Sequence, residues 1–447
     1  MSLTTTMPAV AVITLGCAKN EVDSDKMRAR LLAAGCTLTE DPACADVVLL
    51  NTCAFITEAT EEAIASILEL AGLEKIASGQ ASLLVAGCLP SRYGSELSAE
   101  LPEVTAFVSV QDEERIVEIV GQFSGIDLKE APVEPRANVR HRATTSASAY
   151  LKIADGCSRH CAFCTIPAIR GPYRSVPASE IVAEADELVA SGVRELVLIA
   201  QDTGLWQGDA AELSGPRNLA ALLELLARRF PQVWLRVMYL QPQGVSDELL
   251  ATMAAHANIC NYLDIPLQHA NTRILGEMNR QGSGVEYLQL LARIRQALPD
   301  VALRTTVIAG FPGESRAEAR ELERFIEQAE FDYVGVFPYS PEEGTVAGER
   351  TDQVPRRTRL ARAQRLRDLA DAIGFARTEQ QVGSRQQVLV LEPDPEQVNP
   401  YPLLGRTQRQ APEVDGLVHL DRGEPAEVIS ARIMAACCYD LDGKVLC

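Results

Sequence analysis

The sequence lacks a long apolar run and a recognisable export signal. No apolar run in its 447 residues approaches the ~18 residues that a membrane-spanning helix requires, so nothing predicts a membrane protein. The N-terminus has neither the basic residues nor the apolar core of a secretory signal, and we expect a cytoplasmic protein. Because the cytosol keeps thiols reduced, the 12 cysteines point to metal or redox chemistry before they point to disulfide bonds.

The sequence also lacks a basic segment. Its formal net charge is −19 and its pI is near 4.8. Residues 1–123 hold 7 Lys and Arg against 18 Asp and Glu, and residues 377–447 hold 7 against 11. General affinity for nucleic acids requires Lys and Arg that neutralise phosphates. The charge therefore argues against a protein that binds nucleic acids broadly.

The length predicts two or three domains, and the pattern of apolar residues predicts an α/β protein. Residues 1–123 alternate strand and helix, which indicates an open parallel sheet covered by helices. Residues 124–142 are rich in Pro, Gly and charge and are typical of a linker. The alternation returns over residues 143–376 and suits a partial (β/α)6 barrel, whereas the short strands of residues 377–447 predict a small antiparallel β-barrel.

Individual elements follow from the same pattern. The strands expected in the first domain are Ala9–Leu15, Asp46–Leu50, Ser82–Ala86 and Ala106–Val110. Those expected in the central domain are Ala149–Ile153, Glu195–Ala200, Val233–Tyr239, Tyr262–Leu267, Ala302–Ala309 and Tyr333–Phe337. Those of the last domain are Gln387–Leu391, Leu417–Leu420, Ala426–Met434 and Lys444–Leu446. Arg356–Arg377 predicts an amphipathic helix with a solvated basic face.

One loop of the central domain carries Cys157, Cys161 and Cys164 with the spacing C-x3-C-x2-C. Three thiolates can hold three irons of a 4Fe-4S cluster and leave the fourth iron open for a substrate. The alternative is a structural zinc site in which His160 completes the ligand set. Closed zinc sites usually pair two separate ligand knuckles, and the next downstream cysteine, Cys260, stands alone. The spacing therefore favours the iron–sulfur interpretation.

Three further cysteines each follow a predicted strand of the first domain. Cys17 comes after the first strand, Cys53 after the second and Cys88 after the third. The carboxyl ends of parallel strands share one edge, where ligands bind, so these thiols are expected to converge on a second cluster. The alternative is three buried apolar thiols. The cysteines without such a placement are expected to be incidental, namely Cys36, Cys44, Cys437, Cys438 and Cys447.

The strand ends of the central domain carry polar or glycine-rich turns. Barrel enzymes bind their ligands at these ends. His269 alone is more typical of a satisfied structural histidine than of a catalyst. The turn Gly310–Glu314 either lets the backbone approach a ligand or is simply a tight turn.

The cysteine loop, with Phe163 just before its last cysteine, resembles the signature of the radical S-adenosylmethionine (SAM) superfamily. Together with the strand-end cysteines and the C-terminal strands, it makes the whole chain resemble the radical SAM methylthiotransferase family, whose last domain is a TRAM barrel. Five segments resemble most the branch that modifies ribosomal protein uS12: LGCAKNEVDSD (Leu15–Asp25), NTCAFITEA (Asn51–Ala59), DIPLQHANTRILGEMNR (Asp264–Arg280), LRTTVIAGFPGE (Leu303–Glu314) and GRTQRQAPEVDG (Gly405–Gly416).

The resemblance implies two 4Fe-4S clusters and SAM. In the family, the cluster on the C-x3-C-x2-C loop reduces SAM, and the resulting 5'-deoxyadenosyl radical removes a hydrogen from the β-carbon of an aspartyl residue of uS12. The strand-end cysteines would hold a second cluster that carries the sulfur, and a second SAM would supply the methyl group. A one-electron donor such as flavodoxin or ferredoxin is implied. The side chains and turns expected to line the SAM and substrate pocket are Phe163, Gln201, Asp202, Gln268, Gly310, Gly313 and Glu314.

Three other functions stay open at this point. A tRNA adenosine methylthiotransferase would bind tRNA tightly and in a salt-sensitive way. The acidic C-terminal domain instead favours a basic ribosomal protein as partner and makes tRNA a poorer one. A non-catalytic iron–sulfur electron carrier would ignore SAM, and a zinc-binding adaptor would contain zinc without iron.

Overall fold

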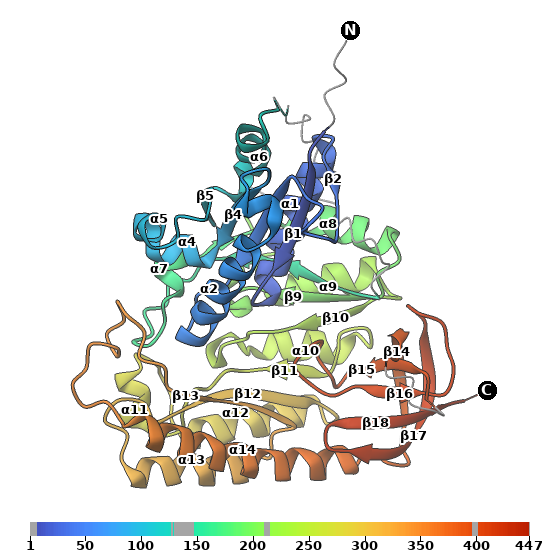
Figure 1. Ribbon diagram of the computed structural model, residues 1–447. Coiled ribbons are helices and arrows are strands. Elements are labelled where there is room, and N and C mark those ends of the chain that lie inside the picture. Colours follow the sequence, from blue (N-terminus) through green and yellow to red (C-terminus); the bar gives the residue numbers. More distant parts are fainter. Residues whose placement is uncertain (1–6, 127, 129–146, 210–214, 396–400, 447) are drawn as a thin grey trace.

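The computed structural model describes residues 7–126, 128, 147–209, 215–395 and 401–446 (Figure 1). Most of the predicted linker, from residue 129 onward, and the terminal Cys447 lie outside these residues. The N-terminal sheet domain lies against one end of the central domain, and the C-terminal barrel packs beside the central strands. Among the described helices, none is long and apolar enough to cross a membrane.

The N-terminal domain is the predicted parallel sheet with helices around it. Its strands are β1 (Ala9–Thr14), β2 (Thr37–Leu38), β3 (Val47–Thr52), β4 (Ser82–Gly87) and β5 (Ala106–Ser109), and they lie in the order β2-β1-β3-β4-β5. The helices are α1 (Ala18–Ala33), α2 (Thr57–Ala71), α3 (Glu74–Ala77), α4 (Cys88–Tyr93), α5 (Leu97–Glu100) and α6 (Ile116–Ser124). Every residue of β3 is buried, as its unbroken apolar run VVLL requires of a central strand covered on both faces.

The central domain has the predicted parallel strands in two groups. One group has the order β10-β9-β6 and the other has the order β11-β12-β13. The strands are β6 (Ser148–Lys152), β9 (Glu195–Ile199), β10 (Trp234–Val237), β11 (Tyr262–Asp264), β12 (Ala302–Ala309) and β13 (Tyr333–Pro338). A hydrogen bond of 2.8 Å from the Cys260 N–H to the Leu235 carbonyl joins the groups. The result is an open, partial barrel.

Helices cover the outside of this barrel. They are α8 (Ala178–Ala190), α9 (Leu219–Arg229), α10 (Asp247–Ala255), α11 (Thr272–Glu277), α12 (Gly284–Ala297), α13 (Arg316–Ala329) and α14 (Arg356–Glu379). A short helix, α7 (Ile166–Arg170), and a small β7–β8 pair (Ala154–Asp155 with Arg174–Ser175) flank the cysteine loop. Alternate strand residues such as Leu196 and Leu198 pack against the helices. Their neighbours Val197 and Ile199 instead join a core with α1 and the C-terminal barrel.

The C-terminal domain is a closed barrel with the order β14-β15-β16-β18-β17. Its strands are β14 (Arg385–Pro393), β15 (Leu403–Thr407), β16 (Val418–Leu420), β17 (Val428–Cys437) and β18 (Asp440–Val445). Sequence reasoning missed β15 and expected an antiparallel barrel. Within this barrel, all pairings between the described strands are antiparallel except β16–β18, which is parallel. A ring with an odd number of strands cannot alternate direction at every pairing, so this exception follows from closure.

The basic face of α14 is only partly solvated. Arg356, Arg357 and Arg365 are exposed, as predicted, whereas other arginines of the helix reach polar partners in the barrel. The guanidinium of Arg377 pairs with Asp332 at 3.0 Å. Arg367 donates to the carbonyl of Val336 at 2.9 Å, and Arg362 forms an ion pair with Glu314. Arginine side chains reach across the helix because their carbon stems pack on apolar surface while the guanidinium finds a polar partner. The helix is thereby fixed to the strand ends of the barrel.

A buried charge cluster joins the C-terminal barrel to the central domain. Glu195 accepts from Arg236 Nε at 2.8 Å and from Arg406 Nη2 at 2.5 Å. Burial alone would raise the pKa of Glu195, but Arg406 and Arg236 outweigh it and lower the pKa to about 2. Each side chain is at most 2% exposed, so the two domains share one interior.

Candidate functional site

The structure brings the strand-end cysteines together around Asn20. The sulfur of Cys17 lies 3.9 Å from the Asn20 Oδ1 atom, and that of Cys88 lies 3.8 Å from the same oxygen. Cys53 and Cys88 interact side chain to side chain, which lowers the pKa of Cys53 and raises that of Cys88. Cys53 and Cys88 are buried, whereas Cys17 is exposed.

The local chain geometry explains why cysteines stand at this edge. Cys17 immediately precedes α1, and Cys88 is the first residue of α4. The unpaired N–H groups of a helix N-terminus favour negative charge, which suits thiolates and an anionic cluster. Gly87 has φ +95°, and a Cβ there would lie 2.2 Å from Asn51 Oδ1 and 2.7 Å from the Thr52 carbonyl oxygen. Glycine therefore permits the turn that aims Cys88 at the other thiols.

Replacing Gly87 with alanine is expected to destabilise the N-terminal domain by about 2–4 kcal/mol, because strain at positive φ adds to a steric clash. The measurement is the urea unfolding midpoint of the apo protein. Gly79→Ala is the matched control, since Gly79 has φ +73° and a Cβ at that position would meet nothing within 4 Å, and only about 1–2 kcal/mol of backbone strain is expected. Equal losses in the two variants would contradict the clash.

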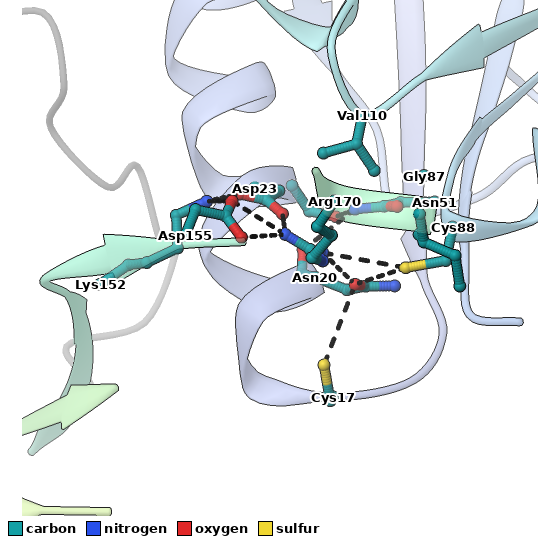
Figure 2. Close-up of polar contacts among 12 residues, drawn as sticks. Cys17, Asn20, Asp23, Asn51, Gly87, Cys88, Val110, Lys152, Asp155 and Arg170 are labelled. Atoms are coloured by element: carbon teal, nitrogen blue, oxygen red, sulfur yellow. Dashed lines mark hydrogen bonds and ion pairs between the residues drawn. The ribbon is translucent and has the colours of Figure 1, made fainter. Parts of the chain in front are cut away.

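Asn20 is the side chain that ties this edge to the central domain. Its amide nitrogen donates to the carbonyl of Leu15 at 3.0 Å and to that of Thr52 at 2.9 Å. Its oxygen accepts from Arg170 Nη2 at 2.8 Å, and the same Arg170 nitrogen lies 3.9 Å from the Cys88 sulfur (Figure 2). Arg170 is the last residue of α7 and follows the cysteine loop closely. Arg170 therefore contacts Cys88 of the strand-end trio and stands close in the chain to the trio of the cysteine loop.

Opposite charges compensate the burial of Arg170. Its Nη1 atom contacts Asp23 at 3.0 Å and Asp155 at 3.0 Å. Lys152 donates to the same two carboxylates (Figure 2). Burial would raise the pKa of Asp155, but Lys152 and Arg170 outweigh it and hold that pKa below its usual range. Two cations and two carboxylates thus fix the first domain to the strand end that leads into the cysteine loop.

The cysteine loop follows directly on Asp155, and its residues Cys161 and Cys164 line one cleft. Gly156 has φ +74°, and a Cβ there would lie 2.3 Å from the Pro172 carbonyl oxygen, so the chain can turn only at a glycine. The backbone N–H of Arg159 points at the Cys157 sulfur at 3.4 Å. Burial raises the pKa of Cys164 to about 12, which opposes a free thiolate and is offset only when a cation or metal binds the sulfur.

The donor sets fit iron–sulfur clusters better than single metal ions. A zinc site brings every thiolate to about 2.3 Å from one ion. A closed zinc site also has four protein ligands, whereas each trio supplies three thiols. Each trio consists of thiols alone; Cys17 and Cys88 stand at the starts of α1 and α4, and the Arg159 N–H points at the Cys157 sulfur. Cysteine trios of this kind are the ligand set of a 4Fe-4S cluster with one open iron.

A cleft opens to solvent beside the cysteine loop. Its volume is about 450 Å³. Cys161 and Cys164 line one wall, and Arg92 and Tyr93 of α4 line another. Residues 343–346 form the rim, where Val346 is 73% exposed. The cleft therefore reaches the loop thiols from the side on which the two domains meet.

The predicted pocket residues of the barrel lie at strand ends, but most carry structural contacts. Gln201 donates to Asp155 at 3.0 Å. Asp202 is 1% exposed; its Oδ2 atom accepts from Arg159 at 2.7 Å, while its Oδ1 atom has no partner among the described residues. Gln268 has the left-handed φ of +71° and bridges to β12 through its backbone. Strained, polar strand ends of this kind are typical of ligand sites.

The glycine-rich turn is held tightly by α14. A Cβ at Gly310 would lie 2.5 Å from Arg359 Cγ, so glycine there serves the close approach of the helix. Glu314 accepts from the Gly310 N–H at 3.0 Å, pairs with Arg362 and contacts His269 Nε2 at 3.1 Å. The Asn271 N–H donates to His269 Nδ1 at 3.0 Å, which places the ring proton on Nε2. His269 is thus a satisfied structural histidine, as expected.

The remaining predicted pocket residues lie nearby. Phe163 is half-buried and packs on the apolar group that contains Phe311 and Tyr339. Gly313 has φ +74°, with Asp352 and Arg350 beside it.

Sequence reasoning assigned no role to Lys19, Asn20 or Arg170. All three are at most 8% exposed, and each has a partner far away in the chain. The available signal was the position of Lys19 and Asn20 inside the segment Leu15–Asp25, and of Arg170 directly after the cysteine loop.

Comparison with known proteins places the chain in a family. Residues 9–109 match the model described as uncharacterized protein family UPF0004, residues 151–326 match the radical SAM superfamily, and residues 382–446 match the TRAM domain. A protein of Syntrophus aciditrophicus named ribosomal protein uS12 methylthiotransferase RimO is 42% identical over 98% of each chain. Proteins with the same name from Trichlorobacter lovleyi and Geobacter sulfurreducens are each 40% identical over 98% of both chains. The chain belongs to the RimO family of methylthiotransferases.

Some solved structures share the fold at low sequence identity. The radical SAM methyltransferase TsrM from Kitasatospora setae superimposes with a TM-score of 0.54 at 14% identity and covers 86% of this chain and 77% of that chain. The radical SAM enzyme OxsB gives a TM-score of 0.51 at 12% identity over 82% of this chain and 56% of that chain. These similarities concern the fold alone. The radical SAM match implies SAM and a 4Fe-4S cluster for the RimO family. The three matches lie inside the predicted ranges 1–123, 143–376 and 377–447, whose exact boundaries stay predictions.

Proposed function

We propose that this protein is a radical SAM methylthiotransferase that modifies the β-carbon of an aspartyl residue of ribosomal protein uS12. The observation that supports this best is the pair of cysteine trios on either side of one buried network, in a chain 42% identical to a uS12 methylthiotransferase over 98% of its length. Arg170 contacts the edge of one trio and stands six residues after the last cysteine of the other. Sulfur insertion at an unactivated carbon requires a radical source and a sulfur carrier close together.

The two trios take different roles in this proposal. Cys157, Cys161 and Cys164 hold the cluster that binds SAM, and Cys17, Cys53 and Cys88 hold a second cluster. When bound, the cofactors supply the electron, the radical that removes the β-hydrogen, the sulfur and the methyl group. The chain itself supplies position: the glycines before Cys88 and Cys157 aim the loops, and Asn20 holds the strand ends at fixed distances.

The buried charges keep the two halves of the site in register. Arg170 and Lys152 cannot leave Asp23 and Asp155 without exposing uncompensated charge to the protein interior, which is costly. The cleft beside Cys161 and Cys164 gives an approach for SAM or substrate. A one-electron donor such as flavodoxin or ferredoxin is proposed to complete the cycle. Gln201, Asp202 and Gln268 at the barrel strand ends are proposed to line the SAM and substrate pocket.

The test offers both candidate substrates to the same enzyme. The protein is reconstituted anaerobically with iron and sulfide and supplied with SAM and a reductant. A uS12-derived polypeptide and tRNA are then presented side by side, and mass spectrometry measures the gain of one methylthio group on each. A gain on the uS12 aspartate is the expected result. A gain on tRNA alone would refute the proposal and identify a tRNA-modifying enzyme.

A further inference from the structure

Lys19 is a buried cation without a counter-ion. It lies in the first turn of α1, two residues after Cys17, and is 8% exposed. Among the residues that the structure describes, its ammonium group makes no hydrogen bond or ion pair; it stacks on the ring of Tyr239 at 3.1 Å from the centroid. An aromatic face attracts a cation but supplies no lone pair. A buried ammonium of this kind leaves its hydrogen-bonding capacity for a ligand.

The surroundings place this ammonium at the mouth of the barrel. Tyr239 follows the C-terminal end of β10, and α1 packs with the inward-facing strand residues of the barrel. Tyr239 has φ +60°, a left-handed conformation that is a rare and strained one for an aromatic residue. Its N–H donates to Asp264 Oδ2 at 3.1 Å, at the end of β11. The chain thus holds the aromatic ring in place at the strand ends, where barrel enzymes bind substrates.

The neighbouring carboxylates are already used. Asp264 pairs with Arg304 at 3.1 Å, and Asp155 pairs with Arg170 and Lys152 at 3.0 and 2.9 Å. Asp264 and Asp155 form no direct contact with Lys19, and they attract its charge only from a distance. Lys19 also stands on the helix that begins directly after Cys17. Its charge therefore lies between the edge that carries one cysteine trio and the mouth of the SAM barrel.

We propose that Lys19 binds the side-chain carboxylate of the substrate aspartate. This inference rests on the proposed function and names the contact by which that substrate is recognised. A carboxylate held by Lys19 places the adjacent β-carbon within reach of both the barrel and the strand-end trio. Charge-assisted hydrogen bonds of this kind fix orientation as well as affinity. Lys19 is then a positioning residue, since the reacting atoms belong to the substrate and the cofactors.

The experiment measures binding apart from turnover. Two labelled uS12-derived peptides, one with the target aspartate and one with asparagine in its place, are titrated with reconstituted protein and SAM, and fluorescence anisotropy gives each dissociation constant. In the wild type, asparagine is expected to weaken binding by roughly 10- to 100-fold, the effect of losing one charged hydrogen bond. Lys19→Met is expected to weaken the aspartate peptide to a similar degree and to change the asparagine peptide little. Lys19→Arg is expected to recover most of the loss.

Two controls separate the effect of the Lys19 charge from an effect on folding. Lys444→Met removes an exposed lysine of β18 and is expected to leave both peptides unaffected. If Lys19→Met does not fold, the wild-type comparison of the two peptides still tests the inference, because asparagine removes the charge from the ligand and leaves the protein unchanged. Equal binding of the two peptides by the wild type would overturn the inference.

A second readout covers SAM and the proposed function itself. SAM binding by each variant is measured by equilibrium dialysis, and a loss confined to SAM would assign Lys19 to the SAM carboxylate and overturn the inference. Methylthiolation of the aspartate peptide by the wild type is followed by mass spectrometry in parallel. If the wild type modifies the peptide and Lys19→Met binds the peptide normally, the role of Lys19 is refuted and the proposed function stands. A wild type that neither binds nor modifies it refutes the proposed function as well.

Discussion

Replacing Cys157 by alanine is expected to abolish SAM cleavage and to remove half of the iron from the reconstituted protein. A cluster held by three thiolates is lost when one ligand is removed, because no other cysteine of the loop can replace Cys157. Cys53→Ala is expected to remove the other half of the iron and all methylthio product, while SAM cleavage continues at the loop. Iron analysis, 5'-deoxyadenosine formation and mass spectrometry of the polypeptide measure the three quantities on the same preparations.

The matched control is Cys44→Ala. Cys44 is an exposed thiol of the same N-terminal domain, hydrogen-bonded to Asp41 and placed before β3 rather than after a strand. Its removal is expected to change neither iron content nor product. Full iron content in Cys53→Ala would contradict a second cluster at the strand ends. Loss of SAM cleavage in that variant would show that the two trios do not act as separate sites.

Glu195→Gln is expected to lower the free energy of unfolding by about 3–5 kcal/mol, because it leaves two buried arginines without a counter-charge. Arg406 belongs to the C-terminal barrel and Arg236 to the central domain, so the loss is expected as separation of the two domains. Denaturant unfolding followed by limited proteolysis measures it. Glu224→Gln removes half of an exposed pair with Arg228 and is expected to cost less than about 1 kcal/mol. Equal costs would refute the buried charge cluster.

The same carboxylate gives a pH dependence with a definite sign. Burial raises the pKa of Glu195, but Arg406 and Arg236 outweigh it and hold the pKa at about 2, against 4.5 in an unfolded chain. The folded state therefore holds its negative charge more firmly than the unfolded state does. The stability from this group is present above about pH 4.5 and is lost as the pH falls toward 2. The loss amounts to about 3 kcal/mol and should vanish in Glu195→Gln.

The fold was largely predictable because apolar periodicity is a local signal. Except for the two-residue strand β2, the parallel strands of the first two domains lie where alternating apolar runs indicated them. β15 escaped because its sequence, LLGRT, is short and ends in polar residues that are buried only through partners elsewhere. The arginines of α14 that pair with the barrel were misread for the same reason. An arginine that pairs with a distant carboxylate has the same local sequence signature as one in water.

The candidate site was likewise predictable where the signal is local in the sequence and not where it depends on distant residues. Strand-end placement and loop spacing indicated the six cysteines, and the structure brings Cys17, Cys53 and Cys88 together at one edge. Arg170 meets Asn20 across 150 residues of chain and Asp23 across 147. No spacing rule joins residues so far apart, so the network that fixes the two trios became visible only in three dimensions.

The shared interior of the last two domains also has a consequence for synthesis on the ribosome. Glu195 is translated 211 residues before Arg406, the cation that completes its pairing. Until β15 leaves the exit tunnel, the nascent central barrel holds an incompletely neutralised carboxylate and an uncovered inner face. Such long-range closure is slow to form and leaves intermediates that aggregate readily. Nascent chains that stop short of the C-terminal barrel should therefore depend on chaperones, and the final segment should complete folding in one late step.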